Sequence, residues 1–239
     1  MVIALIIKIN KFIAFFLVLL LAYFAAIGIV IDRESKTVVG TLPSDNDLVI
    51  IIDPGHGGED GGATASDGTI EKDLNLSIAL CLRDICEMAG YAVYMTRDTD
   101  RSLCDDAFNK NEDMHNRIEL ANKYPNSVLI SIHLNKFSIE KYNGAQVFYS
   151  TNHDGSETLA QAIQSSIARN LQPTNTRQIK KGNDNSILLR LAESPAVIVE
   201  GGFLSNKNEL ELLKTEEYRF KLAYCIFLGL LEYQGSDVK

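Results

Sequence analysis

The sequence predicts a single α/β domain: a mostly parallel, twisted sheet of about six strands flanked by helices on both faces, preceded by an N-terminal hydrophobic helix. Two observations predict this class. Short, continuously apolar segments such as "LVIIID" and "PAVIVEGG" are typical of strands that are buried on both faces. These segments alternate with longer ones of helical periodicity, which favours a parallel sheet covered by helices. A length of 239 residues suits one such domain.

The first 31 residues are expected to form a signal-anchor or transmembrane segment. Residues 12–31 carry no charged side chain and are enough to cross a bilayer as a helix. Lys8 and Lys11 precede this segment and favour a cytoplasmic N-terminus, with the rest of the chain exported. A retained anchor is favoured over a cleaved signal peptide because the apolar run is long and its best cleavage pattern is poor. A buried soluble helix is the weaker alternative, since it would be apolar on every side.

A polar linker and the main domain follow. Residues 32–47 are polar and broken by Gly40 and Pro43, so they are interpreted as a linker. The domain is expected to span residues 48–235. It begins with a strand at 48–53, a glycine-rich loop and a helix at 71–88. The later elements are expected in this order: strand 91–96, helix 106–123, strands 127–133 and 144–150, helix 157–170, strand 195–202, and helices 207–213 and 216–232.

The charge balance excludes some partners. There are 23 lysines and arginines against 31 aspartates and glutamates, a net charge of −8. An acidic chain of this kind is not expected to bind nucleic acid. The four cysteines form no convincing disulfide framework and lack the CxxC spacing of zinc sites. They are expected to remain free.

Polar residues end three of the apolar strands. His56 follows the first strand in "IIDPGHGGEDGG", His133 ends "SVLISIH" and Glu200 ends "PAVIVE". Because α/β sheets bind ligands at the carboxyl ends of their strands, these side chains are expected to share one edge of the sheet. Two neutral imidazoles and carboxylates suit a catalytic zinc, which has three protein ligands and one open position.

The third ligand should be a carboxylate close to the glycine loop, and the residues alone leave four candidates. Asp53, Glu59, Asp60 and Glu71 all qualify. Glu71 is slightly favoured because it opens a helix that fixes its position, whereas Glu59 and Asp60 could be solvated loop charges. The loop does not fit a nucleotide motif, since it lacks a Gly-Lys-Ser/Thr ending and has Asp60 in place of the third glycine of GxGxxG.

Other polar residues are weaker candidates. Asn135, Arg177 and Arg190 could bind substrate, the arginines through bidentate contacts to carboxylates. Arg97 and Arg117 are interpreted as structural.

Two further histidines are placed outside the site. His115 and Glu119 are four residues apart on a polar helix that lacks HExxH, and a solvated helix face explains them better. His153 is interpreted as a loop residue.

Six motifs in sequence order resemble the zinc-dependent N-acetylmuramoyl-L-alanine amidases of bacterial cell-wall turnover. They are "IIDPGHGGEDGGA", "GTIEKDLNLSIA", "YMTRDTD", "NRIELAN", "ISIHLN" and "PAVIVEGGFLSN", and they span nearly all of the domain. The resemblance implies one zinc ion per chain on His56, Glu71 and His133, with Glu200 as the catalytic residue. It implies hydrolysis of the amide between N-acetylmuramic acid and L-alanine of the peptidoglycan stem peptide. The bare domain and the "NGAQVFYS" segment are similar to the spore-cortex, germination-specific branch, which implies cortex modification in the muramic-lactam pathway.

The resemblance also sets expectations for location and partners. The enzyme is expected outside the cytoplasm, membrane-anchored or secreted, at the cortex side of a forespore, with a possible activating protein partner. Gly57 and Gly58 are expected to keep the wall of the site low for a bulky glycan-peptide. The alternatives are a zinc peptidoglycan deacetylase or carboxypeptidase, and a non-catalytic or partner-dependent peptidoglycan-binding protein on the same fold.

Overall fold

The fold is taken from a computed structural model, which describes residues 48–104, 106–183 and 186–236. The expected N-terminal anchor at 1–31 and the linker at 32–47 lie outside the described residues. Within the described ranges, no helix combines the length and the apolar character needed to cross a bilayer.

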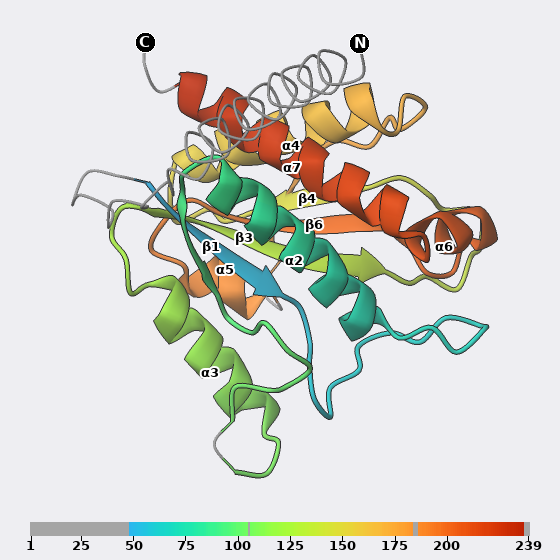
Figure 1. The fold of residues 1–239 in the computed structure, drawn as a ribbon, viewed down its shortest axis with the longest axis horizontal. Coiled ribbons are helices and arrows are strands. Elements are labelled where there is room, and N and C mark those ends of the chain that lie inside the picture. The colour runs from blue at the N-terminus through green and yellow to red at the C-terminus, as the bar shows by residue number, and fades with distance from the viewer. Residues whose placement is uncertain (1–47, 105, 184–185, 237–239) are drawn as a thin grey trace, which may run out of the picture. The chain divides into compact units, whose positions relative to one another are not determined.

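Six strands form one sheet, and the predicted mostly parallel arrangement is confirmed (Figure 1). All neighbouring strands run parallel except one pair, β4 and β6, which is antiparallel. Across the sheet the order is β2 (Ala92–Met95), β1 (Val49–Pro54), β3 (Ser127–Asn135), β6 (Ala196–Phe203), β4 (Gln146–Tyr149) and β5 (Lys180–Lys181).

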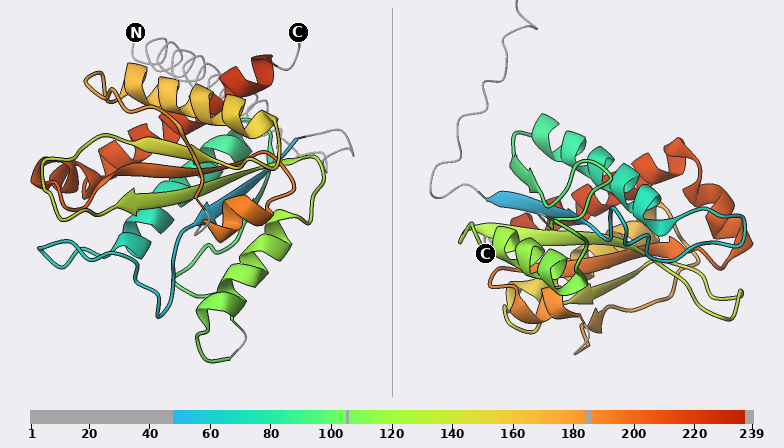
Figure 2. Two further views of the ribbon diagram at one scale, coloured as in Figure 1. Left: turned by 180° about the vertical axis from the view of Figure 1, so that it is seen from behind. Right: turned by 90° about the horizontal axis from the view of Figure 1, so that it is seen from below.

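Helices cover the two faces of this sheet (Figure 2). One face packs against three long helices, α2 (Glu71–Met88), α4 (Gly155–Asn170) and α7 (Glu216–Ser236), with α7 in contact with both α2 and α4. The other face packs against α3 (Lys110–Ala121) and the short α5 (Ile187–Leu191). Helix α6 (Lys207–Leu213) connects β6 to α7.

Strand β1 shows how the two faces are separated. Its side chains alternate, so that Ile50 and Ile52 join the core under α2, α4 and α7, whereas Val49 and Ile51 join the core under α3 and α5. The second series continues into Asp53, which is buried but charged. The face under α3 and α5 therefore turns polar toward the carboxyl ends of the strands, where the candidate site lies.

Three local features differ from the sequence-based expectation. Helix α3 begins at Lys110 rather than at residue 106, because the Asn109 side chain caps it by accepting hydrogen bonds from the backbone N–H groups of Asn111 and Glu112, at 3.0 and 3.2 Å. Strand β5 and helix α5 were not predicted. Each has too few residues to show a periodic pattern.

Candidate active site

The site begins with a row of residues that crosses the sheet. His133 on β3 lies directly opposite Glu200 on β6, and Glu200 lies opposite Gln146 on β4. Residues that are paired in this way point to the same face, here the one that carries α3 and α5. Gly55 continues the row past the end of β1, where its N–H donates to the carbonyl of Ile132. The expectation that the strand-end residues share one edge of the sheet is confirmed for His133 and Glu200.

The structure brings His56, Glu71 and His133 together. Glu71 Oε1 lies 3.4 Å from His56 Nε2 and 3.1 Å from His133 Nδ1. One nitrogen or oxygen atom from each of the three residues lies within 4.8 Å of the others. The two imidazole rings are perpendicular, with centroids 4.9 Å apart. Both histidines line a cavity of about 210 Å³.

Helix α2 and two backbone N–H groups hold Glu71 in place. Its Oε2 accepts a hydrogen bond from the N–H of Ala63 at 2.8 Å, and its Oε1 accepts one from the N–H of Leu134 at 3.2 Å. Burial alone would raise the pKa of Glu71, but hydrogen bonds and charge interactions with His133 and His56 lower it well below the usual range. The carboxylate therefore stays ionised and available to a cation.

Two buried arginines fix the backbone that carries His56. Arg97 donates to the carbonyls of Pro54 and Gly55, at 2.9 and 3.0 Å. Arg117 donates to the carbonyls of Pro54 and His56, at 3.0 and 2.7 Å. His56 itself has a φ of +64°, a conformation that costs free energy for a residue other than glycine and recurs at functional sites. The structural role predicted for Arg97 and Arg117 is thus to clamp the loop in this conformation.

Asp60 lies against the far side of the His56 ring. Its Oδ2 is 3.0 Å from His56 Nδ1, at an angle that does not meet the geometry of a hydrogen bond. Burial lowers the pKa of His56, but the charges of Glu71 and Asp60 outweigh it and raise the pKa above its ordinary value. A carboxylate at this nitrogen leaves Nε2 facing Glu71 and His133. This orienting position of Asp60 was missed from the sequence, where the only signal was an acid four residues after a histidine.

Gly57 and Gly58 have a packing role. A Cβ at Gly57 would lie 2.3 Å from the carbonyl oxygen of Arg101, and one at Gly58 would lie 2.9 Å from the backbone nitrogen of Ser102. Both residues also have positive φ, of +137° and +59°. These glycines therefore let the loop pack against residues 101–102. This contact, rather than a low wall toward the substrate, accounts for their lack of a side chain.

Two other glycines leave the space that the histidines occupy. A Cβ at Gly55 would lie 2.2 Å from the imidazole ring of His133. A Cβ at Gly62 would lie 2.6 Å from the ring of His56 and 2.7 Å from Glu71 Oε2. The glycine-rich loop is thus needed where its backbone passes close to the three candidate ligands.

Glu200 lies beside this group and lacks a hydrogen-bond partner. Its Oε2 is shielded from solvent and has none among the described residues. Burial raises the pKa of Glu200; the nearby His133 and His56 oppose the rise, and Glu71 adds to it. A carboxyl group with a raised pKa beside a group of candidate metal ligands is suited to accept and release a proton during a reaction.

The other acids near the loop are engaged elsewhere or exposed. Asp53 is buried in an ion pair with Arg117 at 2.6 Å, and Glu59 is exposed. His115 and Glu119 are exposed on α3, in agreement with a solvated helix face. His153 is an exposed residue outside the site, where its Nδ1 accepts a hydrogen bond from the N–H of Gly155.

Two of the three candidate substrate-binding residues lie together, and the third lies elsewhere. Asn135 and Arg177 line a second cavity of about 220 Å³ on the same face of the sheet. Arg190 is exposed on α5 and lines neither of these two cavities.

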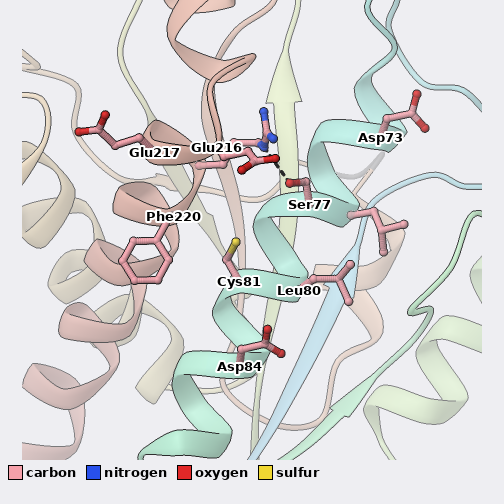
Figure 3. A pocket seen from close by; sticks show the side chains of 10 residues that line it. Asp73, Ser77, Leu80, Cys81, Asp84, Glu216, Glu217 and Phe220 are labelled. Carbon is pink, nitrogen blue, oxygen red and sulfur yellow. Dashed lines mark hydrogen bonds between the residues drawn. The ribbon is translucent and has the colours of Figure 1, made fainter.

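A larger groove lies between α2 and α7, which cover the opposite face of the sheet (Figure 3). Its volume is about 640 Å³, and Leu80, Cys81 and Phe220 line it together with exposed acids at its rim. No histidine lines this groove. It therefore lacks the convergent titratable groups of the smaller cavity under α3 and α5.

Two of the separations among the candidate ligand atoms match those of a tetrahedral metal site. Zinc binds histidine nitrogens and carboxylate oxygens at about 2.0–2.2 Å, which places two ligands of one tetrahedral ion about 3.3–3.6 Å apart. The separations of Glu71 Oε1 from the two histidine nitrogens, 3.1 and 3.4 Å, are close to this range. Two imidazoles and a carboxylate can hold one such ion and leave a fourth position open.

Comparisons with known proteins show the family to which the chain is similar. A family model described as N-acetylmuramoyl-L-alanine amidase matches residues 50–232. The germination-specific N-acetylmuramoyl-L-alanine amidase of Bacillus subtilis is 38% identical over 190 residues, which cover 77% of this chain and 79% of that protein.

Two solved structures from Clostridioides difficile are also similar. The CwlD amidase in complex with the GerS lipoprotein has 39% identity and a TM-score of 0.75, covering 79% of this chain and 98% of that one. An N-acetylmuramoyl-L-alanine amidase from strain 630 has 33% identity and a TM-score of 0.71, covering 80% and 98%.

Proposed function

The chain belongs to the N-acetylmuramoyl-L-alanine amidase family, and on that premise we propose that it is a zinc hydrolase of peptidoglycan. The bond cleaved is the amide between the lactyl carboxyl group of N-acetylmuramic acid and L-alanine of the stem peptide. The observation that carries the proposal is the convergence of His56, Glu71 and His133 next to a half-buried Glu200 whose Oε2 is shielded from solvent.

His56, Glu71 and His133 hold one zinc ion per chain in this proposal. When bound, zinc supplies a Lewis acid that polarises the amide carbonyl and makes water acidic enough to attack at neutral pH. Glu71 contributes a carboxylate kept ionised by its two histidine neighbours. Asp60 orients the ring of His56, and Arg97 and Arg117 hold its backbone.

Glu200 is the general base and then the general acid. Its pairing with His133 across the sheet, and its absence from the group of three residues whose ligand atoms converge, support this role beside the proposed ligands. With its pKa raised by burial, the carboxylate takes a proton from the attacking water and delivers it to the departing amine of L-alanine. The amine must be protonated to leave, because an amide nitrogen is otherwise a poor leaving group.

The biological setting that we propose is spore-cortex modification in the muramic-lactam pathway. The Bacillus subtilis relative is described as germination-specific, and its similarity covers more than three quarters of both chains. A cortex enzyme acts outside the cytoplasm. We therefore retain residues 1–31 as a membrane anchor or signal, residues 32–47 as a linker and residues 48–235 as the catalytic domain.

We also propose a protein partner for the chain. The similar CwlD structure was solved with the GerS lipoprotein. An exported lipoprotein would meet this chain at the same membrane surface. Full activity of the purified chain alone, with no gain from added extracytoplasmic extract, would exclude an activating partner.

Mass analysis of reaction products tests the proposed reaction. The purified full chain is incubated with zinc and intact cortex peptidoglycan. We expect free stem peptides that begin with L-alanine, together with glycan strands that carry free lactyl carboxyl groups. Released acetate would indicate a deacetylase, and a lost terminal amino acid would indicate a carboxypeptidase. Unchanged peptidoglycan, both with and without extract, would leave only a binding role.

A further inference from the structure

A second cavity adjoins the proposed active site on the same face of the sheet. It has a volume of about 220 Å³ and lies over β4 and β5, on the far side of Glu200 from the histidines. It is lined by Asn135, Phe137, Tyr142, Gln146, Phe148, Arg177, Lys180 and Phe203.

The register of the sheet connects this cavity to the site. Gln146, which lines it, is the direct neighbour of Glu200 on the next strand. One row further along, Phe148 of this cavity is paired with Ile198, which lines the cavity of the histidines. Since neighbouring strands lie about 4.8 Å apart, a substrate whose scissile bond is at Glu200 extends into the second cavity within one or two residues.

The charged residues of this cavity are cationic. Among its eight lining residues, all within the described ranges, Arg177 and Lys180 are the charged ones and no carboxylate is present. No ion pair is formed by either cation with another described residue. The anion that acts on Arg177 is the buried Glu209. Burial raises the pKa of Glu209 and the charge of Arg177 opposes the rise, but both oxygens of Glu209 are taken by backbone N–H groups. Two cations without a direct ion pair therefore attract an anionic group, and the attraction is stronger where water is partly excluded.

Arg177 is held in position for such a group. Its Nε donates to the carbonyl of Asn143 at 3.0 Å and its Nη1 donates to the side chain of Gln146 at 2.7 Å. The guanidinium carbon lies 4.8 Å from the centre of the Phe203 ring, against its face. These contacts fix the guanidinium plane, so a ligand does not have to order a flexible side chain.

We propose that this cavity binds the peptide side of the substrate and that Arg177 and Lys180 bind the free carboxylate of the acidic residue next to L-alanine. The inference rests on the proposed function. The glycan on the other side of the scissile bond is built of uncharged N-acetylated sugars, whereas the stem peptide carries carboxylates close to the bond. The aromatic side chains Phe148 and Phe203 cover the aliphatic part of that residue. The enzyme therefore selects substrates in which this carboxylate is free over those in which it is amidated.

A matched pair of substrates tests the selection. N-acetylmuramoyl-L-alanyl-D-isoglutamate and its D-isoglutamine counterpart differ only by a carboxylate and an amide. We expect the full chain, loaded with zinc, to cleave the acid with a kcat/KM roughly ten-fold or more above that of the amide, since charge-assisted bonds to arginine discriminate by this order. Equal values for the two substrates overturn the proposal.

Substitutions locate the selection within the cavity. Lys180→Gln and Arg177→Gln are expected to lower kcat/KM more for the acid substrate than for the amide, so that the ratio of the two values falls toward one. Lys181→Gln is the matched control, because Lys181 is the exposed neighbour on the same short strand and does not line the cavity. Retained preference for the acid in both Lys180→Gln and Arg177→Gln contradicts the proposal. If Arg177→Gln impairs folding, judged by its melting temperature, Lys180→Gln decides alone.

Binding of the released peptide separates this inference from the reaction itself. Calorimetry with L-alanyl-D-isoglutamate is performed on the Glu200→Gln full chain, which needs no turnover. We expect the affinity for this peptide to fall when Lys180 is replaced. We also expect the affinity for the isoglutamine peptide to be lower. If the chain cleaves both substrates but binds the two peptides equally, the proposed role of the cavity is refuted and the amidase reaction is not. Selective binding without any cleavage refutes the amidase reaction alone.

Discussion

Two charged clusters lie next to each other on one face of the sheet and differ in how fully their polar atoms are paired. In the first cluster, Asp53 accepts hydrogen bonds from Thr96, Ser131 and Arg117, each at 2.6 Å. Arg117 also pairs with Asp113 at 2.7 Å. Asp53 and Arg117 are both 2% exposed, and each of their charged groups has partners.

The second cluster, one row further toward the strand ends, is incompletely paired. Here Glu200 Oε2 is buried without a hydrogen bond among the described residues, while His56 Nδ1 faces Asp60 Oδ2 at 3.0 Å and leaves Nε2 toward the other candidate ligands. Glu71 Oε1 faces two imidazoles at once. A cluster that is satisfied internally stabilises the fold, whereas one that lacks partners has capacity left for a ligand. The first cluster is therefore assigned to stability and the second to chemistry.

The largest expected effect is that of Glu200→Gln, which should lower turnover without lowering stability. Glu200→Gln is expected to lower turnover by about 10²–10⁴-fold, because the variant cannot transfer a proton. Its free energy of unfolding should not fall, since a carboxyl group whose pKa burial raises is replaced by a neutral group of the same shape. Turnover is measured by peptide release and unfolding by denaturant titration.

Glu209→Gln serves as the matched control for that substitution. Glu209 is also buried, but its two oxygens accept the backbone N–H groups of Gly144 and Phe203, each at 2.9 Å. An amide can accept only one of these bonds, so stability should fall while turnover is retained. A Glu200→Gln chain with wild-type turnover would remove the distinction between the clusters.

Breaking the fully paired cluster should destabilise the fold strongly. Arg117→Met leaves Asp53 and Asp113 buried without their cation, and we expect a loss of about 3–5 kcal/mol in the free energy of unfolding. Arg83→Met is the control, because its pair with Asp84 is more exposed and is expected to contribute less than about 1 kcal/mol. Urea titration of both variants measures the difference. Equal small losses would show that the buried cluster is not a stabilising one.

Acid should weaken the first cluster within a defined pH range. Burial would raise the pKa of Asp53, but Arg117 and the hydroxyls of Ser131 and Thr96 lower it to about 2. The stabilisation is complete above the unfolded pKa near 4 and is lost as the pH falls through 2, which corresponds to about 2 kcal/mol. We expect the wild type, measured without metal, to lose this much more stability than Asp53→Asn between pH 5 and pH 2. Parallel curves for the two proteins would contradict the assignment.

The smallest expected effect distinguishes two glycines with positive φ. Gly62→Ala and Gly68→Ala should each cost about 1–2 kcal/mol of stability, because φ is +67° and +90°. A Cβ at Gly62 also presses on His56 and Glu71, whereas one at Gly68 meets nothing within 4 Å. We therefore expect only Gly62→Ala to weaken zinc binding, by ten-fold or more. Competition with a chromogenic chelator measures this affinity. Equal zinc affinities in the two variants would show that the space left by Gly62 is not needed for zinc binding.

The parts of the molecule that could be predicted are those in which the sequence pattern of apolar residues follows the burial of the side chains. Helix α2 was predicted at its observed bounds because its apolar stripe is regular. His133 and Glu200 were placed together because parallel strands bring their carboxyl ends to one edge. The antiparallel direction of strand β4 could not be predicted, because an apolar run carries no information on whether it pairs parallel or antiparallel.

The choice among the four acids near the loop could not be derived from the residues. Asp53 and Glu71 both become buried carboxylates, and they differ only in whether Arg117 or the histidines face them. That difference depends on contacts between residues more than 60 positions apart in the chain. The resemblance to a known family favoured Glu71. The orienting position of Asp60 was missed for a different reason: it lies only four residues after His56, but a loop has no regular period that fixes which way a side chain points.

Zinc content measures the central assignment most directly. The full chain is loaded with zinc, freed of loosely bound metal and examined by elemental analysis beside a His56→Ala/His133→Ala double variant whose fold is checked by circular dichroism. We expect one zinc ion per wild-type chain, one per Glu200→Gln chain and none in the double variant. A wild-type chain without zinc, or a double variant that retains it, would contradict the account.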